Sequence, residues 1–238
     1  MYPVTEELLA FGLTRQEANL YLTLLSKGAL SGYEAAKLTG ISRSNTYNAL
    51  AGLTEKGAAY VMEETVTRYC PVPFDEFSGN IIRHLQEKQQ SLLPRLPERE
   101  TEMQGYITIR GTRQIMDKLI NLIQETKQRL YISVPDDILT QIEPYLKQQI
   151  SEEKRVVILS ATPCLIEGAV SYVTSKGENQ IRLIVDSTKV LTGRISSSEN
   201  STCLFSLNRN LVDIFKEMLK NEITLIEMEQ PEYSPDTP

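Results

Sequence analysis

The amino-acid sequence predicts an α+β protein made of two folded parts and a connecting helix. Three observations predict this: short capped helices followed by two strand-like runs in the first third, a heptad-like stretch after them, and strands alternating with helices in the second half. The 238 residues are 41% hydrophobic, enough for the cores of one large or two ordinary domains. We therefore expect a folded globular chain.

Charge, cysteine content and hydropathy narrow the function classes. The formal net charge of −6 argues against a general polyanion binder, so any nucleic-acid contact must come from a local surface. Cys70, Cys164 and Cys203 are scattered and odd in number, unlike a disulfide framework. No apolar run approaches membrane length and no basic-then-apolar leader is present, so we expect a cytoplasmic protein without membrane contacts.

Two capping boxes predict helix starts in the first third of the chain. Thr14 precedes a helical run with Glu17 three residues on, and Ser31 precedes the next run with Glu34 three residues on. In such a box the hydroxyl and the carboxylate each accept a hydrogen bond from a backbone N–H group at the helix start. Helices are therefore expected directly after Thr14 and Ser31.

Glycines predict where these helices end. Gly28, Gly40 and Gly57 follow the helical runs, and glycine takes the left-handed cap conformation without steric cost. Only Ile41 and Ser42 lie between Gly40 and the next helix. This tight connection predicts a helix-turn-helix with Ser42 as the N-cap of its second helix.

A ribbon is expected after the third helix. The runs "AAYVME" and "VTRYCPV" contain β-branched and aromatic residues and are separated by Glu64 and Thr65, which predicts a hairpin. Three helices followed by a two-stranded ribbon make a winged helix-turn-helix, in which the helix after the turn enters the DNA major groove. Residues 1–73 are thus predicted to bind double-stranded DNA.

The helix after the turn has an unusual polar face. This helix lies in the stretch "GISRSNTYNAL", residues 40–50, and continues into Ala51. The face expected to pack on the domain holds Tyr47, Leu50 and Ala51. The face expected to point outward holds Asn45, Asn48 and Ala49. Asn can pair with an adenine edge through two hydrogen bonds, Ser and Thr can contact bases or phosphates, and Arg can pair with guanine, so such a face can read sequence.

Phosphate contacts are expected from basic side chains near this helix and from its positive N-terminus. The predicted DNA-contacting residues are Lys37, Ser42, Arg43, Ser44, Asn45, Thr46, Asn48, Lys56 and Arg68. An alternative stays open, because residues 1–73 carry six Lys or Arg against seven Asp or Glu and the wing tip bears Glu63 and Glu64. A winged-helix module that contacts proteins without reading DNA would fit that acidic balance.

The stretch "LLAFGLTRQEANLYLTLLSKGALSGYEAAKLTGISRSNTYNALAGLTEKGAAYV" resembles the winged-helix domain of the TrmB family of prokaryotic transcriptional regulators. The resemblance rests on a "GLT..EA..Y..LL..G" opening and an "A...G..R...Y..L..L..KG" recognition unit, and it covers nearly all of residues 6–73. It implies DNA contacts at the matching positions, which are Arg43, Ser44, Asn45, Thr46, Asn48 and, in the wing, Arg68. The wing "MEETVTRY" departs from the family, whose wings carry more basic residues.

Residues 74–97 are predicted to form a linker helix that dimerises. Five residues follow one another at alternating steps of three and four, which is the spacing of a coiled-coil seam. They are Ile82, Leu85, Gln89, Leu92 and Leu96. A homodimer is expected because such recognition helices usually read two half-sites related by a twofold axis. The alternative is a single amphipathic helix packed on its own domain. His84, the only histidine, lies beside the seam and is expected to be a packing or surface residue.

Residues 104–229 are predicted to form an α/β domain. Strands are expected at "YITIR", "RLYISV", "RVVILS", "IRLIVD", "KVLT" and "TCLFSL", and helices at "TRQIMDKLINLIQETK", "DDILTQIEPYLKQQI" and "NLVDIFKEMLKN". This alternation favours a largely parallel sheet between helices. The acidic, Pro-rich tail at residues 230–238 is expected to be disordered.

The second half also shows a looser resemblance. "IRGTRQIMDKLINLIQETKQRLYISV" and "LIVDSTKVLTG" are similar to the phospholipase-D-like domain that follows the winged helix in TrmB relatives. Enzymes with that fold use a histidine nucleophile in an H-x-K motif, and this half contains no histidine, so no catalytic residue is predicted. In sugar-responsive relatives the region takes part in effector binding, which implies a small-molecule effector, with a sugar as one candidate.

Metal and cofactor motifs are lacking from the sequence. The chain has no phosphate-binding glycine loop, no H-E-x-x-H and no C-x-x-C, so neither a metal site nor a cofactor is predicted. The sequence therefore favours a dimeric, effector-gated DNA-binding regulator.

Overall fold

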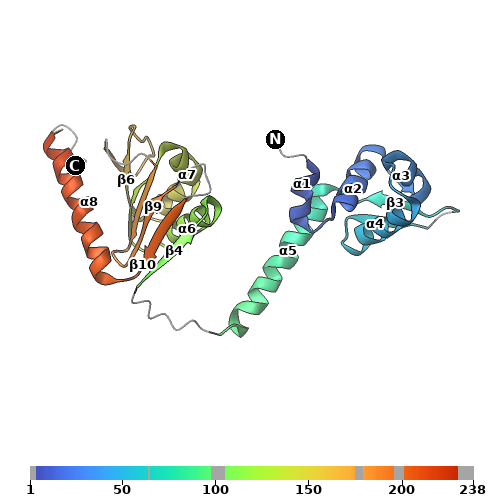
Figure 1. The fold of residues 1–238 in the computed structure, drawn as a ribbon, viewed down its shortest axis with the longest axis horizontal. Coiled ribbons are helices and arrows are strands. Elements are labelled where there is room, and N and C mark those ends of the chain that lie inside the picture. Colours follow the sequence, from blue (N-terminus) through green and yellow to red (C-terminus); the bar gives the residue numbers. More distant parts are fainter. Residues whose placement is uncertain (1–3, 64, 98–104, 175–178, 196–200, 230–238) are drawn as a thin grey trace. The chain divides into compact units, whose positions relative to one another are not determined.

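The computed structural model describes residues 4–63, 65–97, 105–174, 179–195 and 201–229 (Figure 1). The chain divides into two compact units, unit 1 at Met1–Arg99 and unit 2 at Glu100–Pro238. The tail at residues 230–238, for which disorder is predicted, lies outside the described residues. No helix among the described residues is long and apolar enough to cross a membrane.

Unit 1 is mainly helical. Its helices are α1 (Val4–Leu8), η1 (Leu9–Phe11), α2 (Arg15–Lys27), α3 (Gly32–Thr39), α4 (Arg43–Glu55), α5 (Phe74–Leu92) and η2 (Leu93–Arg95). Both predicted capping boxes form: the hydroxyls of Thr14 and Ser31 accept from the N–H groups of Glu17 and Glu34, whose carboxylates accept from the cap N–H groups. The turn prediction is confirmed as well, because α3 ends at Thr39 and α4 begins at Arg43.

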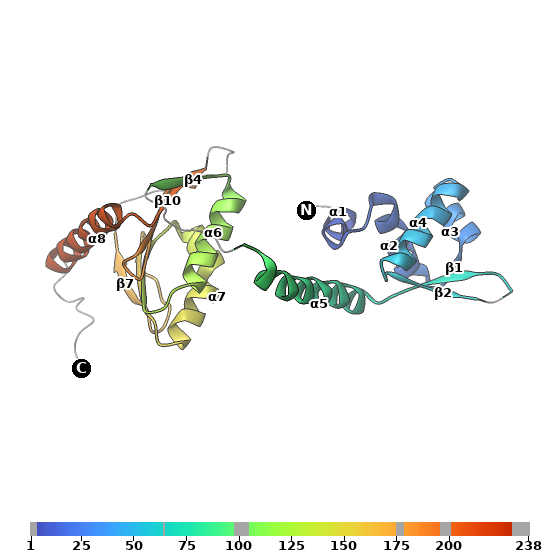
Figure 2. The same cartoon turned by 90° about the horizontal axis from the view of Figure 1, so that it is seen from below.

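The ribbon of unit 1 is a three-stranded sheet. Its strands are β1 (Leu30–Ser31), β2 (Ala59–Met62) and β3 (Arg68–Pro71), in the order β1-β3-β2 (Figure 2). The predicted hairpin is confirmed, since β2 and β3 are antiparallel with Ala59 opposite Pro71 and Met62 opposite Arg68. Strand β1 was not predicted, because two residues are too short to show an alternating pattern.

The core of unit 1 lies between α2, α4 and the start of α5. Tyr21, Leu50 and Phe77 are almost fully buried there. The Tyr21 hydroxyl donates to the Val72 carbonyl oxygen at 2.7 Å and so links α2 to the chain just after the hairpin. Burial, and then the nearby Asp75 carboxylate, raise the pKa of Tyr21 to about 12, so this hydroxyl remains a donor at neutral pH.

The structure corrects the predicted faces of α4. Leu50 is buried as expected, but Tyr47 and Ala51 are exposed, whereas Ala49 is buried beside Thr46. Tyr47 lies against Gly32 at the start of α3, where a β-carbon would collide with its ring. The helix is therefore rotated from the expected orientation, and the lack of a side chain at Gly32 lets the Tyr47 ring pack against the start of α3.

Helix α5 packs on its own domain at its start. Its first two turns pack into unit 1, since Phe77 is buried and Ile81 contacts the same core. From Ile82 onward every side chain is exposed, and α5 extends beyond the other helices of its unit (Figure 1). The predicted seam residues Ile82, Leu85, Gln89 and Leu92 belong to this exposed part of α5, and Leu96, just after η2, is exposed as well.

Unit 2 contains a seven-stranded sheet in the order β4-β10-β9-β8-β5-β6-β7. The strands are β4 (Tyr106–Arg110), β5 (Arg129–Ser133), β6 (Arg155–Ser160), β7 (Val170–Val173), β8 (Gln180–Val185), β9 (Lys189–Arg194) and β10 (Thr202–Ser206). The prediction of a largely parallel sheet is wrong, because only the β5–β6 and β6–β7 pairs are parallel. Strand β7 was not predicted.

A short connection explains why β8 and β9 are antiparallel. Strands β8 and β9 are joined at a tight turn in which Asp186 and Ser187 have φ of 49° and 55°. So short a turn leaves too few residues for the chain to return to the other end of β8, so β9 must run antiparallel to it. The parallel partners β5 and β6 are joined through α7 (Asp136–Ser151), and residues 161–169 connect β6 to its parallel neighbour β7. Helix α6 (Thr112–Gln124) connects β4 to β5, which are not neighbours.

Helices cover both faces of the sheet. Helices α6 and α7 pack on one face, with Leu119, Ile142 and Ile158 in the larger core. Helix α8 (Arg209–Glu229) covers the other face with Val212 and Leu219, as Figure 2 shows. Unit 2 is thus a helix–sheet–helix layer structure around a mixed sheet.

Candidate nucleic-acid interface

The exposed face of α4 begins directly after its N-cap. The Ser42 hydroxyl accepts a hydrogen bond from the Asn45 N–H group, which leaves other N–H groups of the first turn open toward solvent. A helix N-terminus of this kind carries partial positive charge that favours phosphate. The local sequence therefore creates an anion-attracting end at the predicted reading helix.

The polar side chains predicted to read bases lie on that exposed face. Ser44, Asn45 and Asn48 are exposed, and their side chains form no hydrogen bond to any other residue that the structure describes. Their donors and acceptors are therefore available to a partner. Lys37, on α3, is exposed as well.

Arg43 is held over an aromatic ring. Its guanidinium carbon lies 4.9 Å from the centre of the Tyr33 ring, a cation–π geometry that restricts the long side chain. Tyr33 is 53% exposed and Tyr47 is 49% exposed, so both rings belong to the same surface as Arg43. Sequence reasoning missed both tyrosines as surface residues, because an aromatic at helical spacing is normally assigned to the core.

The expectation for Thr46 needs correction. Its side chain is fully buried, and its hydroxyl donates to the Ser42 carbonyl oxygen at 3.0 Å. Thr46 therefore supports the turn from inside the domain. Its placement on a base-reading face assumed that the hydroxyl points outward.

Lys56 has a partner within unit 1. Its ammonium group lies 2.6 Å from a Glu17 carboxylate oxygen and donates to the Gly12 carbonyl oxygen at 2.8 Å. Burial alone would raise the pKa of Glu17, but hydrogen bonds from Lys56 and Thr14 outweigh it and lower that pKa. Lys56 thus joins α4 to α2, and the predicted phosphate contact would have to compete with this pair.

Arg68 also has partners within unit 1. Its guanidinium donates to the Ala29 carbonyl oxygen at 2.9 Å and lies 3.5 Å from the Glu34 carboxylate. It therefore links β3 to the capping box at the start of α3. The wing exposes apolar side chains instead of additional cations: Val61 and Met62 on β2 and Val66 in the loop before β3 are between 38% and 61% exposed.

Unit 2 offers no catalytic histidine, because His84 lies on α5 in unit 1. Among the residues that the structure describes, no group of three or more His, Cys, Asp or Glu could hold a metal ion. Burial raises the pKa of the Cys203 thiol to about 11, which keeps it protonated inside the sheet.

Comparison with known protein families assigns both units. Residues 8–75 match the model "Sugar-specific transcriptional regulator TrmB", and residues 105–221 match the model for the N-terminal subdomain of the TrmB effector-binding domain. The two matched ranges together cover most of the chain. The chain belongs to the TrmB family. Its resemblance to TrmB regulators, drawn from the sequence motifs, is thereby confirmed.

Three relatives are similar to this chain over long ranges. YrhO of Bacillus subtilis is 25% identical over 90% of this chain and 82% of its own length. TrmBL1 of Pyrococcus furiosus, a sugar-sensing transcriptional regulator, is 26% identical over 66% of this chain, which spans only 46% of TrmBL1. TrmBL2 of Thermococcus kodakarensis, a DNA-binding transcriptional repressor, is 24% identical over 73% of this chain and 74% of its own length.

Solved structures give weaker matches. A structure of TrmBL2, described as an archaeal chromatin protein, matches with a TM-score of 0.44 and 18% identity over 91% of this chain and 95% of its own. NucT from Helicobacter pylori matches with a TM-score of 0.42 and 14% identity over 50% of this chain and 96% of its own. The TrmB family assignment rests on the two family models.

Proposed function

We propose that this TrmB family member regulates transcription by inserting α4 into the major groove of double-stranded DNA. The observation that carries the proposal is the α4 surface, where Asn45 and Asn48 lie exposed and without protein partners beside a capped, positive helix end. Family membership supports the same function. Residues 1–73 are the proposed DNA-binding domain.

Two groups of residues share the proposed contact. Base edges are read by Arg43, Ser44, Asn45 and Asn48, while phosphates are held by Lys37 and by the helix end at Ser42. Tyr33 restricts the Arg43 side chain, so less conformational entropy is lost when the guanidinium meets a base. Lys56 and Arg68 act mainly as internal supports of α4 and the wing.

The proposed protein is a homodimer joined through the exposed part of α5, within residues 74–97. Ile82, Leu85 and Leu92 are between 43% and 63% exposed and follow coiled-coil spacing. A row of apolar side chains on a protruding helix is stabilised when a second copy covers it. Two copies would also present two α4 helices to two half-sites.

Residues 104–229 are proposed as the regulatory domain, which binds a small-molecule effector and performs no catalysis. The match of residues 105–221 to an effector-binding subdomain supports this role. The proposed fold of this domain is phospholipase-D-like, with a helix-covered mixed sheet and without the histidine that the catalysis of such enzymes needs. Effector binding would alter DNA affinity by favouring one arrangement of the dimer.

Selection of bound fragments from genomic DNA with purified full-length protein tests the proposal. We expect enrichment of a few related fragments, with an affinity that falls steeply between about 50 mM and about 200 mM salt because phosphate contacts release counterions. Equal binding to selected and random duplexes would refute it.

A protein-interaction module is the second candidate, favoured by the near balance of six basic against seven acidic residues in residues 1–73. The same measurement separates the two functions. A module that contacts only proteins would show no saturable binding to any duplex, even at low salt.

A further inference from the structure

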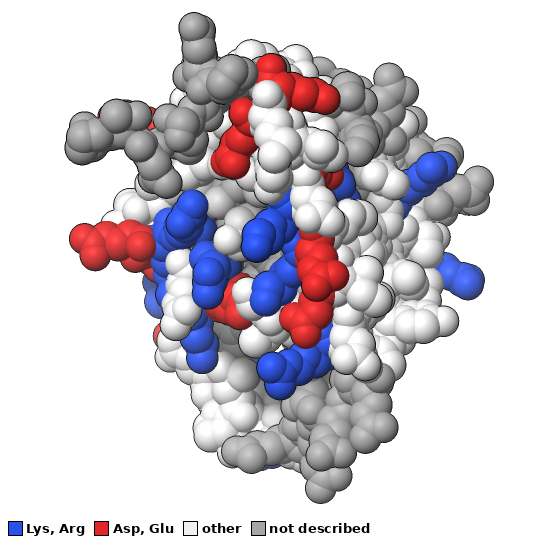
Figure 3. All heavy atoms as spheres, turned by 90° about the vertical axis from the view of Figure 1, so that its left-hand side faces the viewer, with Lys and Arg blue, Asp and Glu red and all other residues white. Residues whose placement is uncertain are grey.

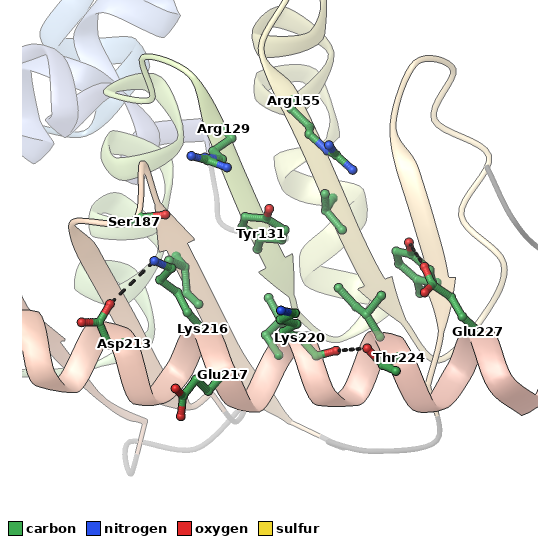
Figure 4. A pocket seen from close by; sticks show the side chains of 15 residues that line it. Arg129, Tyr131, Arg155, Ser187, Asp213, Lys216, Glu217, Lys220, Thr224 and Glu227 are labelled. Carbon is green, nitrogen blue, oxygen red and sulfur yellow. Dashed lines mark hydrogen bonds and ion pairs between the residues drawn. The ribbon is translucent and has the colours of Figure 1, made fainter. Parts of the chain in front are cut away.

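A cavity of about 680 Å³ lies in unit 2 between α8 and the sheet (Figure 4). Strands β5, β6, β7 and β8 form one wall, and α8 forms the other. This volume is within the range of small-molecule sites, commonly about 300–1,000 Å³. Figure 3 looks onto this side of the molecule and shows several Lys and Arg side chains there, with Asp and Glu side chains among them.

Two arginines stand next to each other on the sheet wall. Arg129 opens β5, Arg155 opens β6, and the two are direct partners in the parallel ladder. Both point to the α8 side, because Tyr131 and Val157, two residues further along each strand, pack against α8. Like charges opposite each other destabilise a sheet, so this pair carries a cost that a bound anion would relieve.

Helix α8 adds two lysines from the opposite wall. Lys216 and Lys220 are one turn apart and line the same cavity, and Figure 4 shows Lys220 opposite the strands that carry the arginines. Lys216 has a carboxylate nearby, with its Nζ 3.6 Å from Asp213. Arg129, Arg155 and Lys220 have no ion-pair partner within the described part of the chain.

Three acidic residues also line the cavity. The sign of the ligand's charge therefore depends on how many of these carboxylates are paired with a cation. Asp213 is engaged with Lys216, and Glu227 accepts a hydrogen bond from the Tyr172 hydroxyl at 2.8 Å. A hydrogen bond from a neutral hydroxyl leaves Glu227 negatively charged, so Glu217 and Glu227 together oppose the three unpaired cations. Figure 4 shows both carboxylates on α8, away from Arg129 and Arg155. The end of the cavity near Arg129 and Arg155 is therefore electropositive.

Part of the cavity wall is apolar. Val157, Ile184, Leu219 and Ile223 line it together with the ring of Tyr131. A hydrated inorganic ion gains little from such a surface, whereas an organic body would cover it. The wall chemistry thus fits a molecule with an anionic group at one end and a less polar body.

We propose that this cavity binds a phosphorylated small molecule, with its phosphate held by Arg129, Arg155 and Lys220 and its organic body against Tyr131 and Leu219. Guanidinium groups suit phosphate because each can donate two parallel hydrogen bonds. The proposal gives a chemical class to the effector of the regulatory domain, and its regulatory meaning rests on the proposed function. Binding itself is independent of DNA.

Calorimetric titration of the full chain tests this site with defined probes. The probes are glucose 6-phosphate, fructose 1,6-bisphosphate, inorganic phosphate and glucose. We expect saturable binding of at least one of the two esters, at least about tenfold tighter than inorganic phosphate or glucose. No saturable binding of either ester at millimolar concentration would overturn the proposal, and so would equal affinity for inorganic phosphate.

Variants locate the site. Arg155→Gln and Lys220→Gln each remove one unpaired cation and are expected to weaken ester binding by about tenfold. Lys147→Gln is the matched control, because Lys147 is exposed on α7, on the opposite face of the sheet. The site is overturned if the control weakens binding as much as Arg155→Gln does. Thermal unfolding of each variant checks that the fold is retained.

DNA binding is measured on the same samples. Loss of ester binding with normal DNA binding overturns only this cavity assignment. Ester binding at the cavity without any DNA binding leaves the assignment in place and overturns the proposed function instead. The two failures are therefore distinguishable.

Discussion

Asn48 lies on the exposed face of α4, and its side chain has no hydrogen-bond partner among the described residues. If it pairs with an adenine edge, Asn48→Ala removes two hydrogen bonds at one base pair and costs about 1–3 kcal/mol of binding free energy. We expect this loss on the preferred operator and not on duplexes altered at that base pair. Fluorescence anisotropy with a set of single-base operator variants measures it.

Lys37 provides the matched comparison, since it is exposed on α3 and carries a charge that phosphate attracts. Lys37→Ala is expected to weaken all duplexes alike and to reduce the slope of log affinity against log salt by about one. A uniform loss from Asn48→Ala across every duplex would contradict the base-reading role of that residue.

The Asp186 side chain fixes the backbone at the start of β5 by accepting three backbone hydrogen bonds. Its carboxylate oxygens lie 2.9, 2.8 and 3.0 Å from the N–H nitrogens of Lys127, Gln128 and Arg129. Asp186→Ala removes three hydrogen bonds to a charged group and places alanine at a positive φ, so we expect unit 2 to lose about 1–3 kcal/mol of unfolding free energy. Asp186→Asn is expected to lose less, because Asn retains an acceptor and tolerates the positive φ at this turn. Urea unfolding measures both.

The same contacts make the contribution of Asp186 depend on pH. Burial would raise its pKa, but the N–H groups of Arg129, Lys127 and Gln128 outweigh burial and lower it. A carboxylate with a lowered pKa stabilises the fold above its unfolded pKa of about 3.9, and this stabilisation is lost as pH falls through the folded value. The stability gap between wild type and Asp186→Asn is therefore expected to shrink on acidification. A gap that widened would contradict this account.

Sequence patterns predict most of the helices and strands, but not which elements pack or pair with one another. The capping boxes at Thr14 and Ser31 depend on neighbouring residues, so they could be predicted from sequence. The rotation of α4 could not, because it depends on how closely Gly32 lets Tyr47 approach. The mixed sheet was likewise missed, since period-two patterns carry no information on strand direction.

At the candidate DNA-binding surface, too, local patterns can be predicted from the sequence and long-range contacts cannot. Exposed polar residues such as Asn45 and Asn48 were found from helical periodicity alone. The internal roles of Lys56 and Arg68 depend on Glu17 and Glu34, which are 39 and 34 residues away along the chain. Long-range ion pairs of this kind leave no local signal. Arg129 and Arg155 likewise become neighbours only when β5 and β6 pair.

Leu85, in the predicted seam of α5, is 63% exposed. If a second copy covers this seam, Leu85→Glu places a charge in an apolar contact and opposes an identical charge on the partner. We expect the dimer to dissociate at least about tenfold more readily. Sedimentation equilibrium across a range of protein concentrations measures this change.

Gln90→Glu is the control for that variant, because it adds the same charge on α5 away from the seam. It is expected to leave the dissociation constant within about twofold of wild type. Equal effects of the two substitutions, or a wild type that is monomeric at all concentrations, would contradict dimerisation through α5. Circular dichroism confirms that both variants keep their helix content.

The chain as a whole has separate apolar cores in its two units. The core of unit 1 contains Leu50, and the larger core of unit 2 contains Leu119; both side chains are fully buried. The two clusters have no residue in common. Each unit of about 100–140 residues is large enough to unfold as a cooperative domain.

Calorimetry of the full chain is therefore expected to show two unfolding transitions that respond to different substitutions. Leu50→Ala removes buried methyl groups from unit 1 at a cost of about 2–5 kcal/mol, which lowers that transition by roughly ten degrees or more and leaves the other in place. Leu119→Ala is expected to lower the transition of unit 2 and to leave that of unit 1 in place. A phosphate ester that binds unit 2 is expected to raise only the transition of unit 2. Equal shifts of both transitions by either variant would mean that the two cores unfold as one cooperative unit, and the independence of DNA-binding and regulatory parts would fail with it.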